Sequence, residues 1–276
     1  MNSENLNKSI ILIGPKGVGK SLIAERLQNM LKSNNQDFFL LKLDVIRDLC
    51  KKLYDPQSKL APQEIIKLDK EYIELNNLFN LESSTFKNII SRFYQIFNYQ
   101  EDPNSLFKLS NNGLIAFDNL ISLNILEACL NKIDKPLIID AGGNIGPIID
   151  NVPSSDKFLV LELKDGDKQK RLLTKFGNVV YLAPGEDYEK SSLSSINDEA
   201  NKAYRKNPNS YKSFANIIIE VSNLFSDNTG FAFKTRDTDD TQAQSERLRL
   251  LNNDTVNKIC KQIINLTQLS ENQPGS

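Results

Sequence analysis

The chain has 276 residues, a net charge of −1 and no histidine. The near-neutral charge gives no overall field that would favour nucleic acid or an anionic membrane. The absence of histidine excludes Ser-His-Asp and Cys-His catalysis and histidine-bound zinc. Chemistry would have to use carboxylates, lysine, arginine, hydroxyl groups and metal-bound phosphates, a set that suits phosphoryl transfer.

The cysteines and the polar first residues indicate in which cellular compartment the protein is expected. Cys50, Cys129 and Cys260 lie far apart and are odd in number, which argues against a disulfide framework or a metal knuckle. We expect buried or half-buried thiols in a reducing compartment. The first residues are polar, and no apolar stretch approaches the roughly 20 residues that span a bilayer. We therefore expect a soluble, cytoplasmic protein with neither a membrane nor a nucleic-acid partner.

Residues 8–13, which contain the apolar run Ile10–Ile13, predict a buried strand that ends at a glycine. Residues 14–21, Gly-Pro-Lys-Gly-Val-Gly-Lys-Ser, match the P-loop pattern Gly-x-x-x-x-Gly-Lys-Ser, and apolar residues at helical spacing over 21–31 predict that a helix follows. The glycines permit backbone angles that aim amide N–H groups at an anion, and the helix adds its positive end.

This strand–loop–helix unit predicts a site for a nucleoside triphosphate with Mg²⁺. Lys20 would bind the β- and γ-phosphates as a catalytic cation, and the Ser21 hydroxyl would bind Mg²⁺. The residues expected at the nucleotide are Gly14, Pro15, Lys16, Gly17, Val18, Gly19, Lys20, Ser21 and Leu22.

A second strand is predicted at 38–43, followed by Asp44 and Arg47. Asp44 ends this strand, where open α/β sheets bind ligands, so it is a candidate to orient or deprotonate an acceptor hydroxyl. A helix N-cap is the alternative role. The Asp-x-x-Arg spacing puts both side chains on one helix face, so Arg47 is a candidate to bind an anionic substrate, with a surface ion pair as the alternative.

Residues 55–112 are too long for a simple strand–helix–strand connection, and their pattern predicts a helical insertion with helices at 62–80 and 84–99. Asn-Lys-Ile-Asp at 131–134 looks like the guanine-reading motif of GTPases. Asp-Ala-Gly-Gly at 140–143 could pass for the Asp-x-x-Gly switch motif of the same proteins. In small GTPases the switch motif comes well before Asn-Lys-x-Asp, whereas here it comes after. We therefore interpret residues 131–134 as a polar turn, and the choice between ATP and GTP stays open.

Leu137–Asp140 predicts a third strand. Asp140 follows three apolar residues, where a Walker B carboxylate would hold Mg²⁺, with a strand-end turn as the alternative. Gly142 and Gly143 would let the backbone approach a substrate closely, or would only make a tight turn.

The rest of the chain predicts strands at 179–182 and 217–221, with 158–163 as a candidate for another. A lid is expected over 184–207, where Arg205 is the candidate to neutralise the transferring phosphoryl group and a solvated helix face is the alternative. Residues 223–252 predict a polar loop, and 254–266 predict a closing helix.

Strands that alternate with helices predict an α/β fold, a parallel sheet covered on both faces in one domain over 1–276. In residues 10–27, 43–46, 137–143, 179–182 and 204–221 the chain resembles shikimate kinase and, more broadly, nucleoside-monophosphate-kinase-like P-loop kinases. The resemblance implies a three-layer P-loop NTPase fold, a five-stranded sheet of order 2-3-1-4-5 and a mobile lid. It also implies ATP and Mg²⁺ as ligands and phosphoryl transfer to a small-molecule hydroxyl.

Several positions depart from that family's pattern. Its two substrate-binding arginines would fall at Asp118 and Asn207, the first aspartate of its Asp-x-Asp is Lys42, and its three-glycine turn begins with Ala141. A shikimate carboxylate would have lost its usual partners.

The sequence leaves three functional hypotheses. The first is a small-molecule kinase with an altered acceptor site. The second is an ATP-binding regulatory protein that no longer catalyses. The third is a toxin-like kinase acting on a nucleotide sugar or a macromolecule, suggested by Asp44-x-x-Arg47 and the insertion. The sequence indicates neither the acceptor nor the oligomeric state.

Overall fold

The computed structural model describes residues 3–15, 18–43, 126, 133–141, 172–185, 212–222, 224, 251–267 and 269. Three helices in these ranges are α1 (Ser3–Lys8), α2 (Lys20–Ser33) and α14 (Asn253–Leu266). The strands are β1 (Ile10–Ile13), β2 (Phe39–Lys42), β3 (Leu137–Asp140), β4 (Asn178–Pro184) and β5 (Ile217–Val221).

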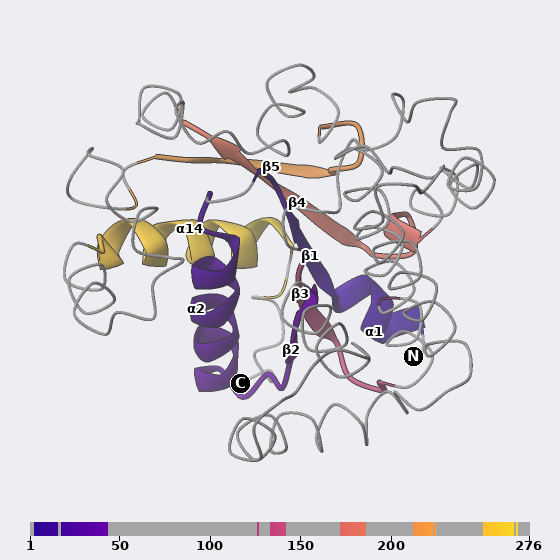
Figure 1. The fold of residues 1–276 in the computed structure, drawn as a ribbon. Helices are drawn as coiled ribbons and strands as arrows, with labels where there is room; N and C mark the ends of the chain where they lie inside the picture. The colour runs from indigo at the N-terminus through magenta and orange to yellow at the C-terminus, as the bar shows by residue number, and fades with distance from the viewer. Residues whose placement is uncertain are drawn as a thin grey trace, which may run out of the picture.

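The five strands form one parallel sheet in the order β2-β3-β1-β4-β5 (Figure 1). The predicted α/β class, the parallel sheet and the strand order are therefore confirmed. The register aligns Lys42 of β2 with Asp140 of β3, Asp140 with Leu12 of β1, and Leu12 with Val180 of β4. These four residues make one row across the sheet, close to the carboxyl ends of β2, β3 and β1.

The connections between successive strands lead in opposite directions from β1 and β3, which are neighbours in the sheet. The strand after β1 in the chain is β2, which lies beyond β3, whereas the strand that follows β3 is β4, which lies beyond β1. In open α/β sheets, a crevice for ligands forms at the carboxyl edge where successive connections diverge in this way. The ends of β1 and β3 are therefore where a site is expected.

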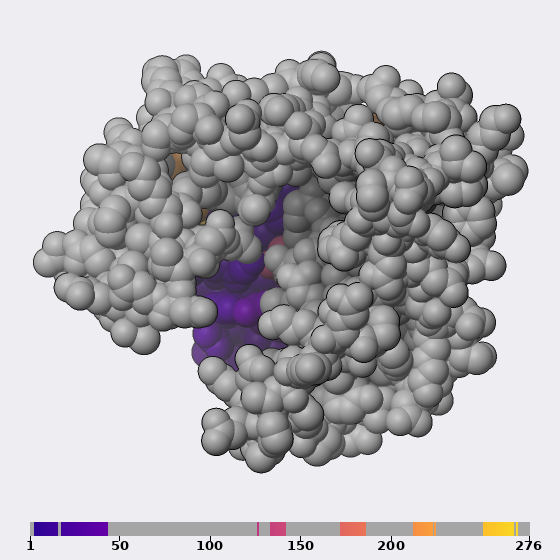
Figure 2. All heavy atoms as spheres, viewed as in Figure 1, coloured from indigo at the N-terminus to yellow at the C-terminus, as the bar shows by residue number. Residues whose placement is uncertain are grey.

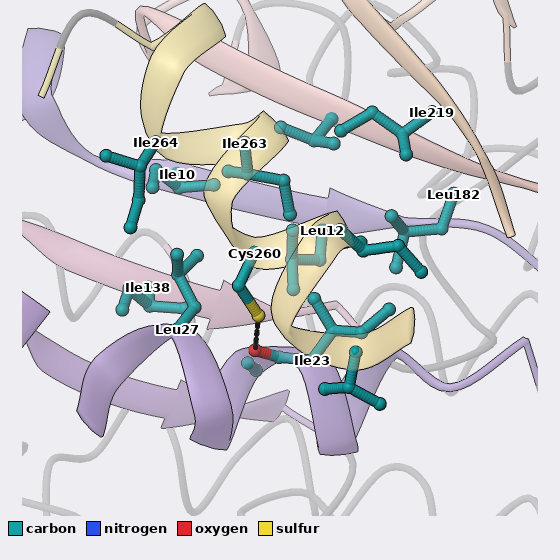
Figure 3. Close-up of a cluster of buried hydrophobic side chains, with 14 of the residues drawn as sticks. Ile10, Leu12, Ile23, Leu27, Ile138, Leu182, Ile219, Cys260, Ile263 and Ile264 are labelled. Atoms are coloured by element: carbon teal, nitrogen blue, oxygen red, sulfur yellow. Dashed lines mark hydrogen bonds between the residues drawn. The ribbon is translucent and has the colours of Figure 1, made fainter. Parts of the chain in front are cut away.

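Helices α2 and α14 pack together on one face of the sheet (Figures 1 and 3). In α2 the spacing of Ile23, Leu27 and Leu31 aligns three apolar side chains toward the sheet, and all three are fully buried. They pack against alternate residues of the strands, among them Ile10, Leu12, Ile138, Leu182 and Ile219, and against Val256, Ile259, Cys260, Ile263 and Ile264 of α14.

Cys260 joins the two helices inside this cluster. Its Sγ donates a hydrogen bond to the backbone carbonyl of Ile23, at 3.7 Å (Figure 3). Burial raises the pKa of the thiol to about 12, although the charge of Arg26 opposes the shift. The thiol therefore stays protonated and acts as a small apolar side chain, as predicted. Cys50 and Cys129 lie outside the described residues.

The opposite face of the central strands is buried as well. Ile11, Ile139 and Tyr181 are each at most 1% exposed. Burial on both faces explains why β1 and the first three residues of β3 are continuous apolar runs rather than alternating ones. Strand β5 differs, because Ile218 is 51% exposed and Glu220 is exposed on that same side. Among the described strands, β5 is an edge whose outer face meets solvent.

The start of the chain corrects one prediction. The predicted strand at 8–13 begins only at Ile10, because Ser3–Lys8 forms α1. Ser9 fixes the junction: its Oγ donates to the carbonyl of Asn5 at 2.6 Å and accepts from the N–H of Leu137 at 2.8 Å. A six-residue polar helix leaves little periodic signal in the sequence, which is why it was missed.

The other described elements match their predictions within one or two residues. The closing helix predicted at 254–266 starts at Asn253, where the Asn252 side chain accepts a hydrogen bond from the N–H of Thr255 at 3.1 Å. The N–H of Asn252 donates to the carbonyl of Leu224 at 2.9 Å, so it connects the two ends of the predicted polar loop at 223–252. No helix in the described part of the chain is long and apolar enough to span a bilayer.

Several predicted segments lie outside the described residues. They are the helical insertion at 55–112, the candidate strand at 158–163, the lid apart from Pro184 and Gly185, and most of the 223–252 loop.

The packing of α14 on the sheet predicts a contrast between two positions of the same helix. Ile263 is fully buried in the cluster, whereas Leu266 is 52% exposed. We expect Ile263→Ala to lower the free energy of unfolding by about 2–5 kcal/mol through lost burial and a residual cavity. Leu266→Ala should cost less than about 1 kcal/mol. Urea unfolding followed by circular dichroism checks both, and equal losses would contradict the packing described.

Candidate functional site

The candidate site is at the carboxyl edge of the sheet, where the glycine loop (residues 14–19) joins β1 to α2. Its described residues are Gly14, Pro15, Val18 and Gly19, whereas Lys16 and Gly17 lie outside the described residues. Gly14, Pro15 and Val18 are buried, and Gly19 is partly exposed. The loop is therefore packed against the end of the sheet.

Gly14 is at a position that only glycine fits. Its φ is +151°, and a Cβ added there would lie 2.7 Å from the carbonyl oxygen of Leu182 in β4. A backbone atom in the middle of a sheet cannot move away to make room. The missing side chain lets the chain turn out of β1 directly beside β4.

Gly19 makes the turn into α2. It is the N-cap residue with φ +94°, in the left-handed region. A Cβ there would lie 2.5 Å from Cδ1 of Leu224, a buried residue after β5. Leu224 was not predicted at the site, because nothing in the local sequence indicates contact with the loop.

Lys20 is the first residue of α2, and its side chain turns back into the glycine loop. Its Nζ donates to the carbonyl oxygens of Gly14 at 2.9 Å and Pro15 at 2.8 Å. The residue is only 6% exposed. The loop carbonyls thus fix an ammonium group inside the curve of the loop, which makes this curve a place for an anion.

The start of α2 adds further positive potential. Its first described intrahelical hydrogen bond runs from the N–H of Ile23 to the carbonyl of Gly19, at 3.0 Å. Helix geometry places the N–H groups of Ser21 and Leu22 before the start of this ladder. The first turn contains no acidic residue, so no carboxylate of its own neutralises the positive end of the helix. Leu22 packs its side chain against the core cluster, so its contribution to a ligand site would be its N–H.

Asp140 brings a carboxylate to the same edge. It is the last residue of β3, it is 1% exposed, and it is in register with Leu12. The N–H of the next residue, Ala141, donates to the carbonyl of Leu12 at 3.2 Å, which fixes the end of β3 against β1. Ile138, two residues earlier, packs in the α2–α14 cluster. Since side chains alternate along a strand, Asp140 is on the α2 face of the sheet.

Lys42 and Glu25 form an ion pair between β2, the strand beside β3, and α2. Lys42 ends β2 in register with Asp140, and its Nζ donates to Oε1 of Glu25 on α2. The two side chains are 31% and 50% exposed. Atoms of this N-terminal part of the chain, purple in Figure 2, reach the surface of the molecule. The sequence marked Lys42 only as a departure from a family pattern, and it gave no sign of Glu25.

The predicted acceptor residues are not among those described. Asp44, Arg47, Gly142, Gly143 and Arg205 all lie outside the described residues. In the sequence, Asp44 directly follows Leu43, which is fully buried after β2, and Gly142 directly follows Ala141 after β3. Their roles remain predictions.

Of the candidate guanine motif at 131–134, the structure describes only Ile133 and Asp134. Asp134 precedes β3 and accepts a hydrogen bond from Nδ2 of Asn5 in α1, at 3.3 Å. It is therefore near the amino ends of β3 and β1, whereas the glycine loop follows their carboxyl ends. The interpretation of residues 131–134 as a polar turn stays a prediction, because Asn131 and Lys132 lie outside the described residues.

Within the described ranges, no group of three or more Cys, Asp or Glu residues could hold a metal ion. Ser21 at the start of α2 and Asp140 at the end of β3 supply a hydroxyl and a carboxylate, groups of the kind that bind Mg²⁺ together with phosphate oxygens.

The sequence matches no model of a known protein family and no curated protein.

The glycine loop predicts an order of stability for two single substitutions. We expect Gly14→Ala to lower the free energy of unfolding by about 3 kcal/mol, because its methyl group would collide with the Leu182 carbonyl. Gly19→Ala should cost only about 1–2 kcal/mol for the left-handed backbone, since the end of the Leu224 side chain can rotate away. Urea unfolding measures both values. A Gly14→Ala protein as stable as Gly19→Ala would contradict the close packing of Gly14.

Proposed function

We propose that the chain is an ATP-dependent phosphotransferase that transfers the terminal phosphoryl group to a hydroxyl of a small molecule. The observation that carries the proposal is the position of the Lys20 ammonium, which the Gly14 and Pro15 carbonyls hold inside the loop between β1 and α2. A buried cation, glycines at positive φ and the start of a helix together suit a polyphosphate. The Gly-x-x-x-x-Gly-Lys-Ser pattern supports a P-loop at this place.

The described residues have distinct roles under this proposal. Lys20 would exchange the loop carbonyls for β- and γ-phosphate oxygens, and would neutralise charge that develops during transfer. The N–H groups of Ser21 and Leu22, at the positive end of α2, would bind phosphate oxygens as well. The Ser21 hydroxyl and the Asp140 carboxylate would hold Mg²⁺, directly or through water. Bound Mg²⁺ supplies charge neutralisation between the phosphates.

The residues proposed to bind the acceptor are indicated by the sequence alone. Asp44 would orient or deprotonate the acceptor hydroxyl, and Arg47 would bind an anionic part of the acceptor. Gly142 and Gly143 would allow its close approach, and Arg205 would supply a cation from the lid. Chain continuity supports this assignment, because Asp44 and Gly142 come within two residues of the ends of β2 and β3.

A second candidate function is a nucleotide-binding regulatory protein without transfer activity. The observation that favours it is Lys42, a cation in register with the proposed metal-binding carboxylate of Asp140. A positive charge beside that carboxylate would weaken the binding of Mg²⁺. This candidate predicts ATP binding without turnover that depends on an acceptor. A toxin-like kinase, which would modify a nucleotide sugar or a macromolecule, stays a sequence-based alternative.

Lys20→Ala tests the nucleotide site. Loss of the ammonium should weaken ATP binding at least about tenfold, and should lower ADP release from MgATP by about a hundredfold or more. Calorimetry measures the binding and a coupled assay measures ADP release. Lys32→Ala is the matched control, because Lys32 is exposed in the last turn of the same helix. Unchanged ATP binding in Lys20→Ala would refute the proposed nucleotide site.

The same assay separates the candidate functions when acceptors are added. Shikimate is the first acceptor to test, and a broader set of small hydroxyl compounds follows. ADP release that rises with an acceptor in the wild type and not in Lys20→Ala supports the small-molecule kinase. ATP binding without such stimulation favours the regulatory protein, and a phosphorylated protein or nucleotide sugar favours the toxin-like kinase.

A further inference from the structure

The ion pair between Lys42 and Glu25 has no role in the proposed phosphoryl transfer, but it lies beside the strand that carries Asp140. Lys42, Asp140 and Leu12 are register partners on three adjacent strands. Leu40, two residues before Lys42, packs against the α2–α14 cluster. Side chains alternate along a strand, so Lys42 is on the α2 face, as its contact with Glu25 of α2 also requires.

Lys42 therefore has two carboxylates within reach. Its ammonium contacts Glu25, which is 50% exposed. Asp140 is one strand away, and strands in a sheet are about 4.8 Å apart. A lysine has a flexible four-carbon stem, so its Nζ can reach the carboxylate of a register partner on the same face. The buried position of Asp140, which is 1% exposed, makes an opposite charge there more strongly attractive than at the surface.

We propose that Glu25 is a positioning residue that holds the Lys42 ammonium away from Asp140, so that the lysine does not compete with a divalent cation for that carboxylate. This inference rests on the proposed function, in which Asp140 holds Mg²⁺. An ammonium group and a divalent cation cannot share the same carboxylate oxygens without strong repulsion. The pair that prevents this is exposed and weak, so loss of one charge is enough to release Lys42.

Glu25 also lies close to the proposed metal site along its own helix. It is four residues after Ser21, so both side chains are on one face of α2. One face of the helix thus carries the hydroxyl proposed to bind Mg²⁺ and, one turn later, the carboxylate that restrains the competing cation. On this account Lys42 is compatible with metal binding because Glu25 is present.

The test is the gain in ATP affinity that Mg²⁺ provides, which is the dissociation constant in EDTA divided by that in excess MgCl₂. Calorimetry with ATP as the probe measures both values without any turnover. Glu25→Gln removes the charge with little change in shape. It should lower the gain by roughly fivefold, the effect that one exposed ion pair supports.

Two further measurements isolate Lys42 as the cause. In a Lys42→Met background, Glu25→Gln should leave the gain unchanged, because no ammonium remains to move. Asp37→Asn is the matched control: it breaks the exposed ion pair between Asp37 and Lys135, which precedes β2 and β3 at the opposite edge of the sheet. That variant should give the wild-type gain.

The outcomes distinguish this inference from the proposed function. If the wild type binds no ATP, the proposed function fails and this inference fails with it. If ATP binds but Glu25→Gln has the same gain as the wild type, only the inference is overturned. A loss that persists in the Lys42→Met background also overturns it, because the charge of Glu25 would then act without Lys42.

Discussion

The close approach of Gly14 to the backbone of β4 is the constraint on which the carboxyl edge depends. Strand β1 is paired on both sides, with β3 and with β4, so the chain leaving it has no free lateral space. It turns at Gly14, where a side chain would collide with the Leu182 carbonyl. That turn presents the carbonyls of Gly14 and Pro15 to Lys20 and leads into α2 at Gly19. The buried ammonium and the start of the helix both follow from one residue without a Cβ.

Charge at this edge is arranged in two layers. The inner layer consists of Lys20 and Asp140, both buried, one following β1 and one ending β3. The outer layer is the exposed pair of Lys42 and Glu25, one from β2 and one from α2. Buried charges interact strongly, whereas exposed pairs contribute little to stability. The outer pair is therefore better understood through its effect on the inner carboxylate than as a contribution to the stability of the fold.

The strands and the two long helices could be predicted because burial on both sides leaves continuous apolar runs, such as Ile10–Ile13, and because α2 and α14 repeat apolar residues at helical spacing. Strand order came from a family resemblance, not from the residues themselves. Helix α1 was missed because a short polar helix depends on tertiary contacts, here those of Asn5 with Asp134 and of Ser9 with Leu137. Glu25 and Leu224 were missed because their roles depend on neighbours distant in sequence, Lys42 and Gly19, and no local pattern encodes such contacts.

The central claim is that the glycine loop and the start of α2 bind the phosphates of ATP. Amide hydrogen exchange with and without MgATP tests it most directly, because it reads the N–H groups that would contact phosphate. The account predicts slower exchange at Gly19, Ser21 and Leu22 on addition of MgATP, and no change at Asp134 and Lys135 near the amino ends of the strands. Exchange at Gly19, Ser21 and Leu22 that MgATP leaves unaltered would contradict the account.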